Sequence, residues 1–141
     1  MPGTAFIKAE AKRLPFPDDS FDLVTISFAT RNLNIDRPRM LEALREFRRV
    51  LKPGGVFLNL ETTRPPNSLL WFLMRAYVKA LIGVLNILFP KSRSSYSFLR
   101  NTILNYYSPQ EFSALLTEAG FTTPSQKILF PCAVALHTAV K

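Results

Sequence analysis

With 141 residues, the sequence is long enough for one domain with a hydrophobic core and too short for two domains of ordinary size. Hydrophobic residues make up 48% of it and charged residues 20%, which excludes an intrinsically disordered chain. Lysine and arginine outnumber aspartate and glutamate by 18 to 10, so the net charge is +8 and the chain favours anionic surroundings.

This positive charge leaves three interpretations open: a solvated basic face, an anionic membrane surface, or nucleic acid. The basic residues are scattered through apolar helical segments, and the sequence carries no Gly-Arg or aromatic RNA-binding signature. We therefore expect no nucleic-acid partner. The single cysteine, Cys132, excludes an internal disulfide and leaves no thiol pair for zinc, so we expect no metal site.

The first regular elements are expected between residues 21 and 61. Residues 21–28 are a nearly continuous run of β-prone residues, which predicts a parallel strand buried on both faces of a sheet. Apolar residues three and four apart predict an amphipathic helix over residues 37–51. Lys-Pro-Gly-Gly at 52–55 ends this helix, and residues 56–61 read as the next strand. A strand, a helix and a strand with short joints form a right-handed crossover unit, which indicates an α/β fold.

The end of the sequence predicts one more helix and two strands. Ser108 and Glu111 fit a capping box that opens the helix, and Gly120 ends it at a left-handed cap. Strands are expected over residues 123–130 and 132–140.

The segment 69–89 is the most apolar part of the sequence. Its strongly polar residues, Arg75, Lys79 and Asn86, fall within one narrow stripe of a helix. A membrane-spanning helix would place two of these charges near mid-bilayer at about 2.5–3.5 kcal/mol each, which disfavours spanning. Two interpretations remain: a core helix of the domain, or a cap or interfacial helix that serves a lipid substrate.

Short motifs follow one another in a distinctive order along almost the whole chain. They are Leu-Pro-Phe-Pro-Asp at 14–18, Ile-Ser-Phe at 26–28, Arg31-Asn32, Arg-Val-Leu-Lys-Pro-Gly-Gly at 49–55 and Ala-Val-Ala-Leu-His at 133–137. The Leu-Pro-Phe and Lys-Pro-Gly-Gly pieces indicate a class I methyltransferase. With the remaining motifs, the sequence resembles the ubiquinone/menaquinone biosynthesis C-methyltransferase (UbiE) family, most weakly between residues 69 and 108.

The resemblance implies an α/β fold, namely the C-terminal portion of a doubly wound, Rossmann-like class I methyltransferase sheet. Such a sheet binds S-adenosylmethionine across the carboxyl ends of its strands. Residues 1–141 would form one partial methyltransferase domain, with residues 67–107 as an apolar helical insertion or cap. The implied reaction is S-adenosylmethionine-dependent methylation of a ring carbon on a prenylated quinol, of the demethylmenaquinol or ubiquinol-precursor type. The implied location is cytoplasmic and peripheral to the membrane, or on the matrix side in a eukaryote.

The resemblance also assigns site residues. Glu10 and Ala11 fall where the family has an Asn-Ala pair beside the adenine, and Ser27 matches a serine near the donor, so these three are the expected cofactor-binding residues. Glu10 departs from the family, because a carboxylate accepts hydrogen bonds but cannot donate as an amide does. Arg31 and Asn32 match the pair that faces the quinol head group, where a guanidinium would stabilise a developing phenolate. The alternatives are a solvated loop cation for Arg31 and simple packing for Ser27.

For other residues with reactive or polar side chains, the sequence allows either a structural or a functional role. His137 lies in an apolar predicted strand, which favours a structural role over a catalytic one. Tyr96, Tyr106 and Tyr107 would either line a quinone pocket or fill the core.

One part of the family's donor site has no counterpart in this sequence. The glycine-rich loop and the acid that holds the ribose would precede residue 1, and Gly3 follows no strand. In the family's strand order, residues 6–9 form the far edge, and two further strands would separate them from the strand at 23–27. That strand would then expose an unpaired apolar edge.

These expectations leave several functions open. The chain is a C-methyltransferase that needs a complementing chain or a homo-oligomer, or it is a catalytically inactive truncated paralogue that acts as a binding or membrane-associated module. A methyltransferase fragment for an unrelated small molecule is the third alternative. On its own the chain is expected to bind S-adenosylmethionine weakly or not at all.

Overall fold

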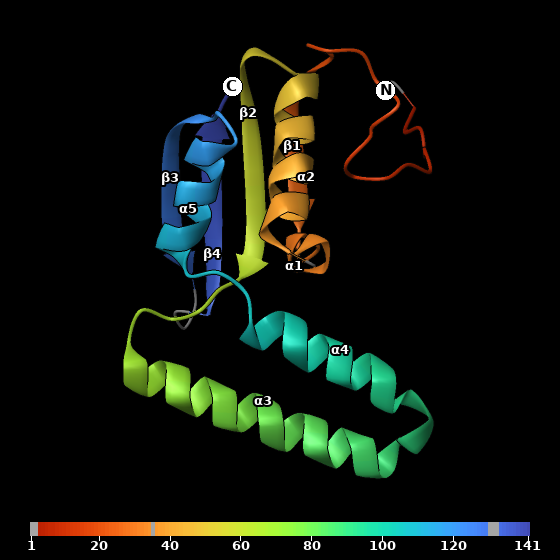
Figure 1. Ribbon diagram of the computed structural model, residues 1–141, viewed down its shortest axis with the longest axis vertical. Coiled ribbons are helices and arrows are strands. Elements are labelled where there is room, and N and C mark those ends of the chain that lie inside the picture. The colour runs from red at the N-terminus through yellow and green to blue at the C-terminus, as the bar shows by residue number, and fades with distance from the viewer. Residues whose placement is uncertain (1–2, 35, 130–132) are drawn as a thin grey trace.

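The computed structural model describes residues 3–34, 36–129 and 133–141, and Figure 1 shows their arrangement. In chain order the elements are β1 (Phe21–Ser27), α1 (Thr30–Leu33), α2 (Arg37–Val50), β2 (Leu51–Thr62), α3 (Ser68–Leu88), the 3-10 turn η1 (Pro90–Ser92), α4 (Arg93–Leu104), α5 (Pro109–Glu118), β3 (Thr122–Leu129) and β4 (Val134–Val140). Phe130 and Cys132, which were expected to end one strand and begin the next, lie outside the described residues.

The four strands form one sheet in the order β1-β2-β4-β3, with β1 parallel to β2 and the other neighbours antiparallel. The predicted crossover unit is therefore confirmed by β1, α2 and β2. Strand β2 begins at Leu51, earlier than expected, because Leu51 already pairs with Phe21. The register then shifts at a turn where Gly54 has a φ of 77°, which glycine adopts without steric cost.

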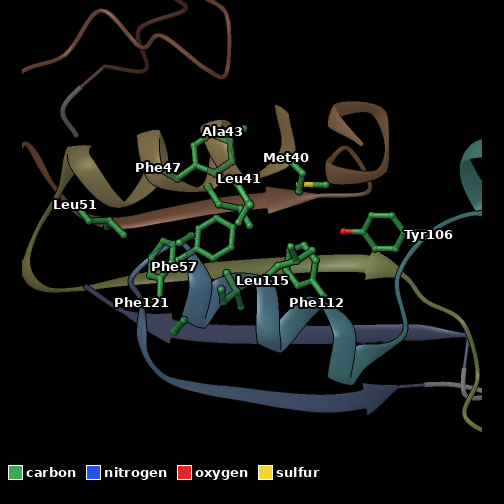
Figure 2. Packing of buried hydrophobic residues seen from close by; sticks show 14 residues of the cluster. Met40, Leu41, Ala43, Phe47, Leu51, Phe57, Tyr106, Phe112, Leu115 and Phe121 are labelled. Atoms are coloured by element: carbon green, nitrogen blue, oxygen red, sulfur yellow. The ribbon is translucent and has the colours of Figure 1, made fainter. Parts of the chain in front are cut away.

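The hydrophobic core lies between the sheet and the helices α2 and α5, which cover the same face (Figure 1). Phe57 of β2 stacks on Phe47 of α2 at 5.7 Å between ring centroids and contacts Phe121 at 5.4 Å. Figure 2 shows side chains of both helices meeting around Phe57. The buried cluster consists of Met40, Leu41, Ala43, Leu44, Phe47, Leu51, Phe57, Tyr106, Phe112, Leu115, Leu116, Ala119, Phe121 and Ala139.

Local sequence signals set the ends of these two helices. Asp36 accepts a hydrogen bond from the backbone N–H of Arg39 at 2.8 Å and caps α2. The predicted capping box of Ser108 and Glu111 is present at the start of α5. Gly120 follows α5 with a φ of 95°, as expected for a left-handed helix end.

Strand β1 is parallel, as predicted, but the prediction that it is buried on both faces is wrong. It forms one edge of the sheet, and Leu23 is 52% exposed. Because α2 and α5 cover only one face, Leu58 and Leu60 of β2 on the other face stay partly exposed. The unpaired apolar edge that was expected is confirmed, whereas the opposite edge, β3, carries the edge-protecting residues Pro124 and Lys127.

The segment before β1 does not form the expected edge strand. Residues 3–9 lie outside helices and strands, and Phe6 is 95% exposed. A strand needs a neighbour for its backbone hydrogen bonds, and none of the described strands lies beside this segment.

Helices α3 and α4 form a hairpin that projects beyond the carboxyl ends of β1 and β2 (Figure 1). Only Val78 and Ile82 of α3 are buried, so the interpretation of α3 as a core helix is wrong. Phe72 and Ile87 are 67% and 77% exposed. By length and composition α3 is apolar enough to span a membrane, and 11% of its most apolar stretch is buried.

Candidate functional site

A cluster of buried polar side chains lies where β1 and β2 end. Helix α1 begins just after β1 and brings Thr30 and Arg31 against Asn59 and Glu61 of β2. Ligands of open α/β sheets bind outside the carboxyl ends of the strands, so the cluster occupies the expected position for a site.

Arg31 and Glu61 form a buried ion pair. Nη1 of Arg31 donates to Oε1 of Glu61 at 2.6 Å, and the backbone N–H of Arg31 donates to Oε2 at 3.2 Å. The side chain of Glu61 is fully buried and that of Arg31 is 16% exposed. Arg31 is therefore not a solvated loop cation, because its charge is held in a sheltered position by a carboxylate.

Glu61 is fixed by further donors from its own strand and from α1. The backbone N–H and the hydroxyl of Thr62 each donate to Oε1 at 2.8 Å. The hydroxyl of Thr30 donates to Oδ1 of Asn59 at 2.5 Å and lies 3.4 Å from Oε2 of Glu61. A buried carboxylate is tolerated only when it is paired and hydrogen-bonded, and Glu61 satisfies both conditions.

The sequence interpretation did not assign Asn59 or Glu61 to the site. In β2 they alternate with Leu58 and Leu60, so they share the helix-covered face with Phe57. An Asn and a Glu on the face that packs against the core are the signal that marks them.

Tyr106, in the segment between α4 and α5, completes the cluster. Its side chain is buried, and Figure 2 shows its hydroxyl directed inward, toward Met40. Burial, with a smaller contribution from the nearby charge of Glu61, raises the pKa of the Tyr106 hydroxyl, so it stays protonated. Of the two expected roles for the tyrosines, core filling is confirmed for Tyr106.

The other two tyrosines take different places. The Tyr107 hydroxyl donates to Oδ1 of Asn34 at 2.8 Å, next to α1, and partial burial raises the pKa of Tyr107. Tyr96 lies on α4 and is partly exposed. His137 is buried, and its Nε2–H donates to the carbonyl of Pro109 at 3.2 Å, as a structural residue does.

Three polar groups in the cluster are buried and have no hydrogen-bond partner within the described part of the chain. They are Nε of Arg31, Nδ2 of Asn59 and the hydroxyl of Tyr106. All three can donate, so the cluster contains more buried donors than the described acceptors satisfy. Such a cluster suits a ligand that carries oxygen acceptors.

The other expected residues near this end of the sheet do not join the cluster. Asn32 is exposed on α1, beside Arg31. Ser27 is exposed at the end of β1 and pairs with Leu60, which places it on the face of the sheet opposite to Glu61.

Glu10 and Ala11 lie in the irregular segment beside α2 (Figure 1). Glu10 is exposed and pairs through its backbone with Arg13. Ala11 lines a shallow hollow with Ile26 and Phe47. The hydrogen bonds and ion pairs of the described residues do not connect Glu10 or Ala11 to Ser27 or Arg31.

An apolar groove of about 530 Å³ runs along the α3–α4 hairpin and reaches the polar cluster. Thr62 belongs to both, because it lines the groove and its hydroxyl lies 3.3 Å from Nη1 of Arg31. The remaining lining residues are Pro65, Leu70, Leu73, Met74, Tyr77, Val78, Leu81, Ile82, Leu99, Ile103 and Ala133. Arg31 and Glu61 do not line the groove themselves, and Thr62 is the residue that connects the groove to the ion pair.

Comparisons with known proteins cover nearly the whole chain. The model of the ubiE/COQ5 methyltransferase family matches residues 3–141. The chain is 37% identical over 137 residues to the ubiquinone/menaquinone biosynthesis C-methyltransferase UbiE of Pseudomonas paraeruginosa, covering 97% of this chain and 52% of that protein. It is 37% identical over 139 residues to the mitochondrial 2-methoxy-6-polyprenyl-1,4-benzoquinol methylase of Xenopus laevis, covering 99% and 44%. The chain thus spans about half the length of these curated relatives.

A solved structure shares the fold. Human N-acetylserotonin methyltransferase in complex with SAM superposes with a TM-score of 0.62 at 17% identity, over 96% of this chain and 33% of that one. At this identity the likeness concerns the fold alone. It agrees with the predicted α/β class, part of a Rossmann-like methyltransferase sheet.

Proposed function

Because the chain belongs to the ubiE/COQ5 methyltransferase family, we propose that it forms the quinol-binding part of an enzyme that methylates a ring carbon of a prenylated quinol in ubiquinone or menaquinone biosynthesis. The observation that carries this proposal is the sheltered Arg31–Glu61 pair, which Thr62 connects to the apolar groove. A polar head site joined to an apolar groove matches a substrate with a hydroxylated ring and a prenyl tail.

Arg31 is the proposed catalytic residue. A ring carbon of a quinol becomes nucleophilic when a neighbouring hydroxyl gives its proton to solvent as the substrate binds, and the charge then develops on the phenolic oxygen. Transfer of the methyl group to that carbon would leave S-adenosylhomocysteine, and loss of the carbon's proton to solvent would restore the aromatic ring. A guanidinium held in place before the reaction stabilises that oxygen without reorganising. Asn32, exposed beside Arg31, supplies an amide that orients the ring, while the groove excludes water around the reacting carbon.

Activity of this chain combined with the N-terminal half of a relative tests this role. Arg31→Ala is expected to lower turnover by about 10²–10³ while donor affinity changes little, because the charge acts on the transition state. Arg39→Ala is the matched control, since Arg39 is an exposed, ion-paired arginine on α2. Ser27→Ala should instead show a modest loss of donor affinity. Normal turnover of Arg31→Ala would refute the catalytic assignment.

The residues expected to hold the methyl donor lie apart from one another in this chain. S-adenosylmethionine supplies the methyl group when bound, but Ala11 lines a hollow with Ile26 and Phe47, whereas Ser27 is exposed at the end of β1. We therefore propose that donor binding needs a complementing chain. Calorimetric titration of the 141-residue protein should show weak binding or none. A micromolar dissociation constant from a monomer would contradict this, and failure of every complementing chain to restore activity would favour the inactive binding module.

The open edge of β1 is the proposed contact for that complementing chain or for a second copy. Its backbone groups and exposed Leu23 are free to pair with another strand. Leu23→Lys should reduce association in sedimentation velocity, because a charge on an edge strand disfavours pairing. Ile128→Lys on the other edge, where Ile128 is 38% exposed, is the control and should have no effect.

Peripheral membrane contact is proposed for α3, on the cytoplasmic or matrix side. Arg75 and Lys79 lie among its exposed apolar residues and favour an anionic surface. Sedimentation with anionic liposomes should show binding that weakens with salt, since surface attraction is screened over about 8–10 Å at physiological ionic strength. Binding that resists alkaline carbonate would indicate a spanning helix instead.

A further inference from the structure

We propose that Glu61 is a positioning residue of the quinol site: it holds Arg31 by Nη1 so that the Nε edge of the guanidinium stays free to bind one oxygen of the substrate ring. This inference rests on the function proposed above. Glu61 does not touch the substrate in this arrangement. It sets the direction of Arg31, which does.

The carboxylate of Glu61 is itself immobilised. It accepts from Arg31 Nη1, from the Arg31 backbone, and from both the backbone and the hydroxyl of Thr62. These donors come from α1 and from the end of β2, so Glu61 ties the two elements together. A carboxylate with this many bonds has one orientation, and the nitrogen that it holds has one position.

The guanidinium is engaged on one side only. It is planar and carries its five N–H groups in a fixed geometry, so fixing Nη1 also fixes the direction of the Nε–H. Nε is buried, and the described residues offer it no acceptor. Leaving a charged donor buried and unpaired is costly, so the arrangement is explained if an acceptor from outside the chain completes it.

The surroundings favour an oxygen on a ring over a second carboxylate of the protein. Asn59 Nδ2 is also buried without a partner in the described part of the chain, and Asn59 belongs to the same cluster through its hydrogen bond with Thr30. The groove lined by Thr62 adjoins the Arg31–Glu61 pair, because the Thr62 hydroxyl contacts both residues. A hydroquinone offers ring oxygens on a flat apolar body, which suits both features.

A purely structural role explains the pair less well. Replacing a buried ion pair by apolar residues is often neutral or stabilising, so such a pair is weak evidence for stability alone. Elsewhere in the chain, Glu46 binds Arg49 differently. It accepts hydrogen bonds from both Nε and Nη2 of Arg49, at 2.8 Å each, so the Nε edge of Arg49 is already occupied. The free Nε edge of Arg31 distinguishes the two pairs, and Glu46 provides a matched control.

The test uses the full 141-residue chain, its Arg Nε–H resonances, and methoxyhydroquinone as a soluble ring without a tail. Arg31→Lys identifies the Arg31 signal. In the wild type, the ring should shift that signal saturably. In Glu61→Gln, which keeps size and acceptor oxygen but loses the charge, ring affinity should fall about tenfold to a hundredfold, the range for a lost charge-assisted hydrogen bond. Glu61→Asp should recover part of the affinity, and Glu46→Gln should bind as the wild type does.

Binding of farnesol, a prenyl tail without a ring, separates positioning from general damage. Its affinity should be the same in Glu61→Gln and wild type, because the tail contacts only the groove. If Glu61→Gln loses affinity for farnesol as much as for methoxyhydroquinone, the site has collapsed and the inference is overturned. If Glu61→Gln binds the ring as tightly as the wild type, Glu61 does not position Arg31, and the proposed function still stands. If the wild type binds farnesol but its Arg31 Nε–H resonance does not shift when methoxyhydroquinone is added, the inference fails. If neither ligand binds, the proposed function fails, and the inference with it.

Discussion

Helices α2 and α3 use apolar residues in opposite ways. In α2, Met40, Leu41, Ala43, Leu44, Phe47 and Val50 are buried against the sheet and α5, and the opposite face is charged. In α3, which is longer and more apolar, only Val78 and Ile82 are buried. An apolar sequence therefore predicts a helix in both places but a core position in only one of them. What decides is whether another element lies against the apolar face.

The same contrast separates two regions of the molecule. The body, made of the sheet with α2 and α5, contains the buried core and sets the stability of the fold. The α3–α4 hairpin packs mainly on itself and leaves a groove and several large apolar side chains in contact with solvent. Such a surface suits a lipid substrate or a membrane interface, because either would cover it. Substitutions that match one residue in each region can test this division.

The largest difference is expected for phenylalanines. Phe57 is fully buried at the centre of the core, whereas Phe72 of α3 is 67% exposed. Phe57→Ala should lower the free energy of unfolding by about 3–5 kcal/mol, since it removes a packed ring and leaves a cavity. Phe72→Ala should change it by less than about 0.5 kcal/mol. Urea unfolding followed by fluorescence of Trp71 and by circular dichroism measures both, and equal losses would show that the hairpin is part of the core.

A smaller effect is expected from pH, and it should arise in the body. Burial lowers the pKa of His137 below its ordinary value of 6.5. As pH falls below about 6.5, the unfolded chain gains a proton that the folded chain resists, so stability decreases by at most about 1.4 kcal/mol per pH unit. The lowered pKa values of Glu46, held mainly by Arg49, and of Glu111, held mainly by the Ser108 backbone, add losses only below about 4.5.

Melting temperatures at pH 7.5 and 5.5 test this prediction. His137→Gln keeps a donor for the Pro109 carbonyl but does not titrate, so its melting temperature should depend less on pH over this interval. If the variant loses as much stability as the wild type, another group is responsible.

The sequence predicted most of the body because its signals are local. The periodicity of α2, the Ser108–Glu111 capping box and the glycine after α5 act over a few residues and appear where they were expected. The parallel direction of β1 was also predicted. Its burial was not, because burial depends on neighbours that this chain does not place beside it.

The candidate site also contains residues that local sequence signals predicted and residues that only the fold reveals. Arg31 was identified from a motif, but its partner Glu61 is 30 residues away and becomes visible only when β1 and β2 pair. Tyr106 joins the cluster from still farther along the chain. Of the expected donor residues, Glu10 and Ala11 lie in a segment without a strand, so their predicted role stays a prediction. The periodicity and spacing of residues along a sequence do not reveal contacts between distant segments.

The smallest expected effect compares two helix caps of similar geometry. Ser108 caps α5 in the body, and Asn67 caps α3 by accepting from the backbone N–H groups of Leu69 and Leu70 at 2.9 and 3.1 Å. In an isolated helix either cap contributes about 1 kcal/mol. Because α5 packs on the core, the loss in Ser108→Ala should appear in full in the free energy of global unfolding. Because α3 buries little, Asn67→Ala should fray the first turn of α3 while global unfolding changes by less than about 0.3 kcal/mol. Hydrogen exchange of the amides at the start of α3, measured beside urea unfolding, distinguishes local from global loss. If Asn67→Ala destabilises the whole chain as much as Ser108→Ala does, the hairpin and the body unfold as one unit, and the division between them is wrong.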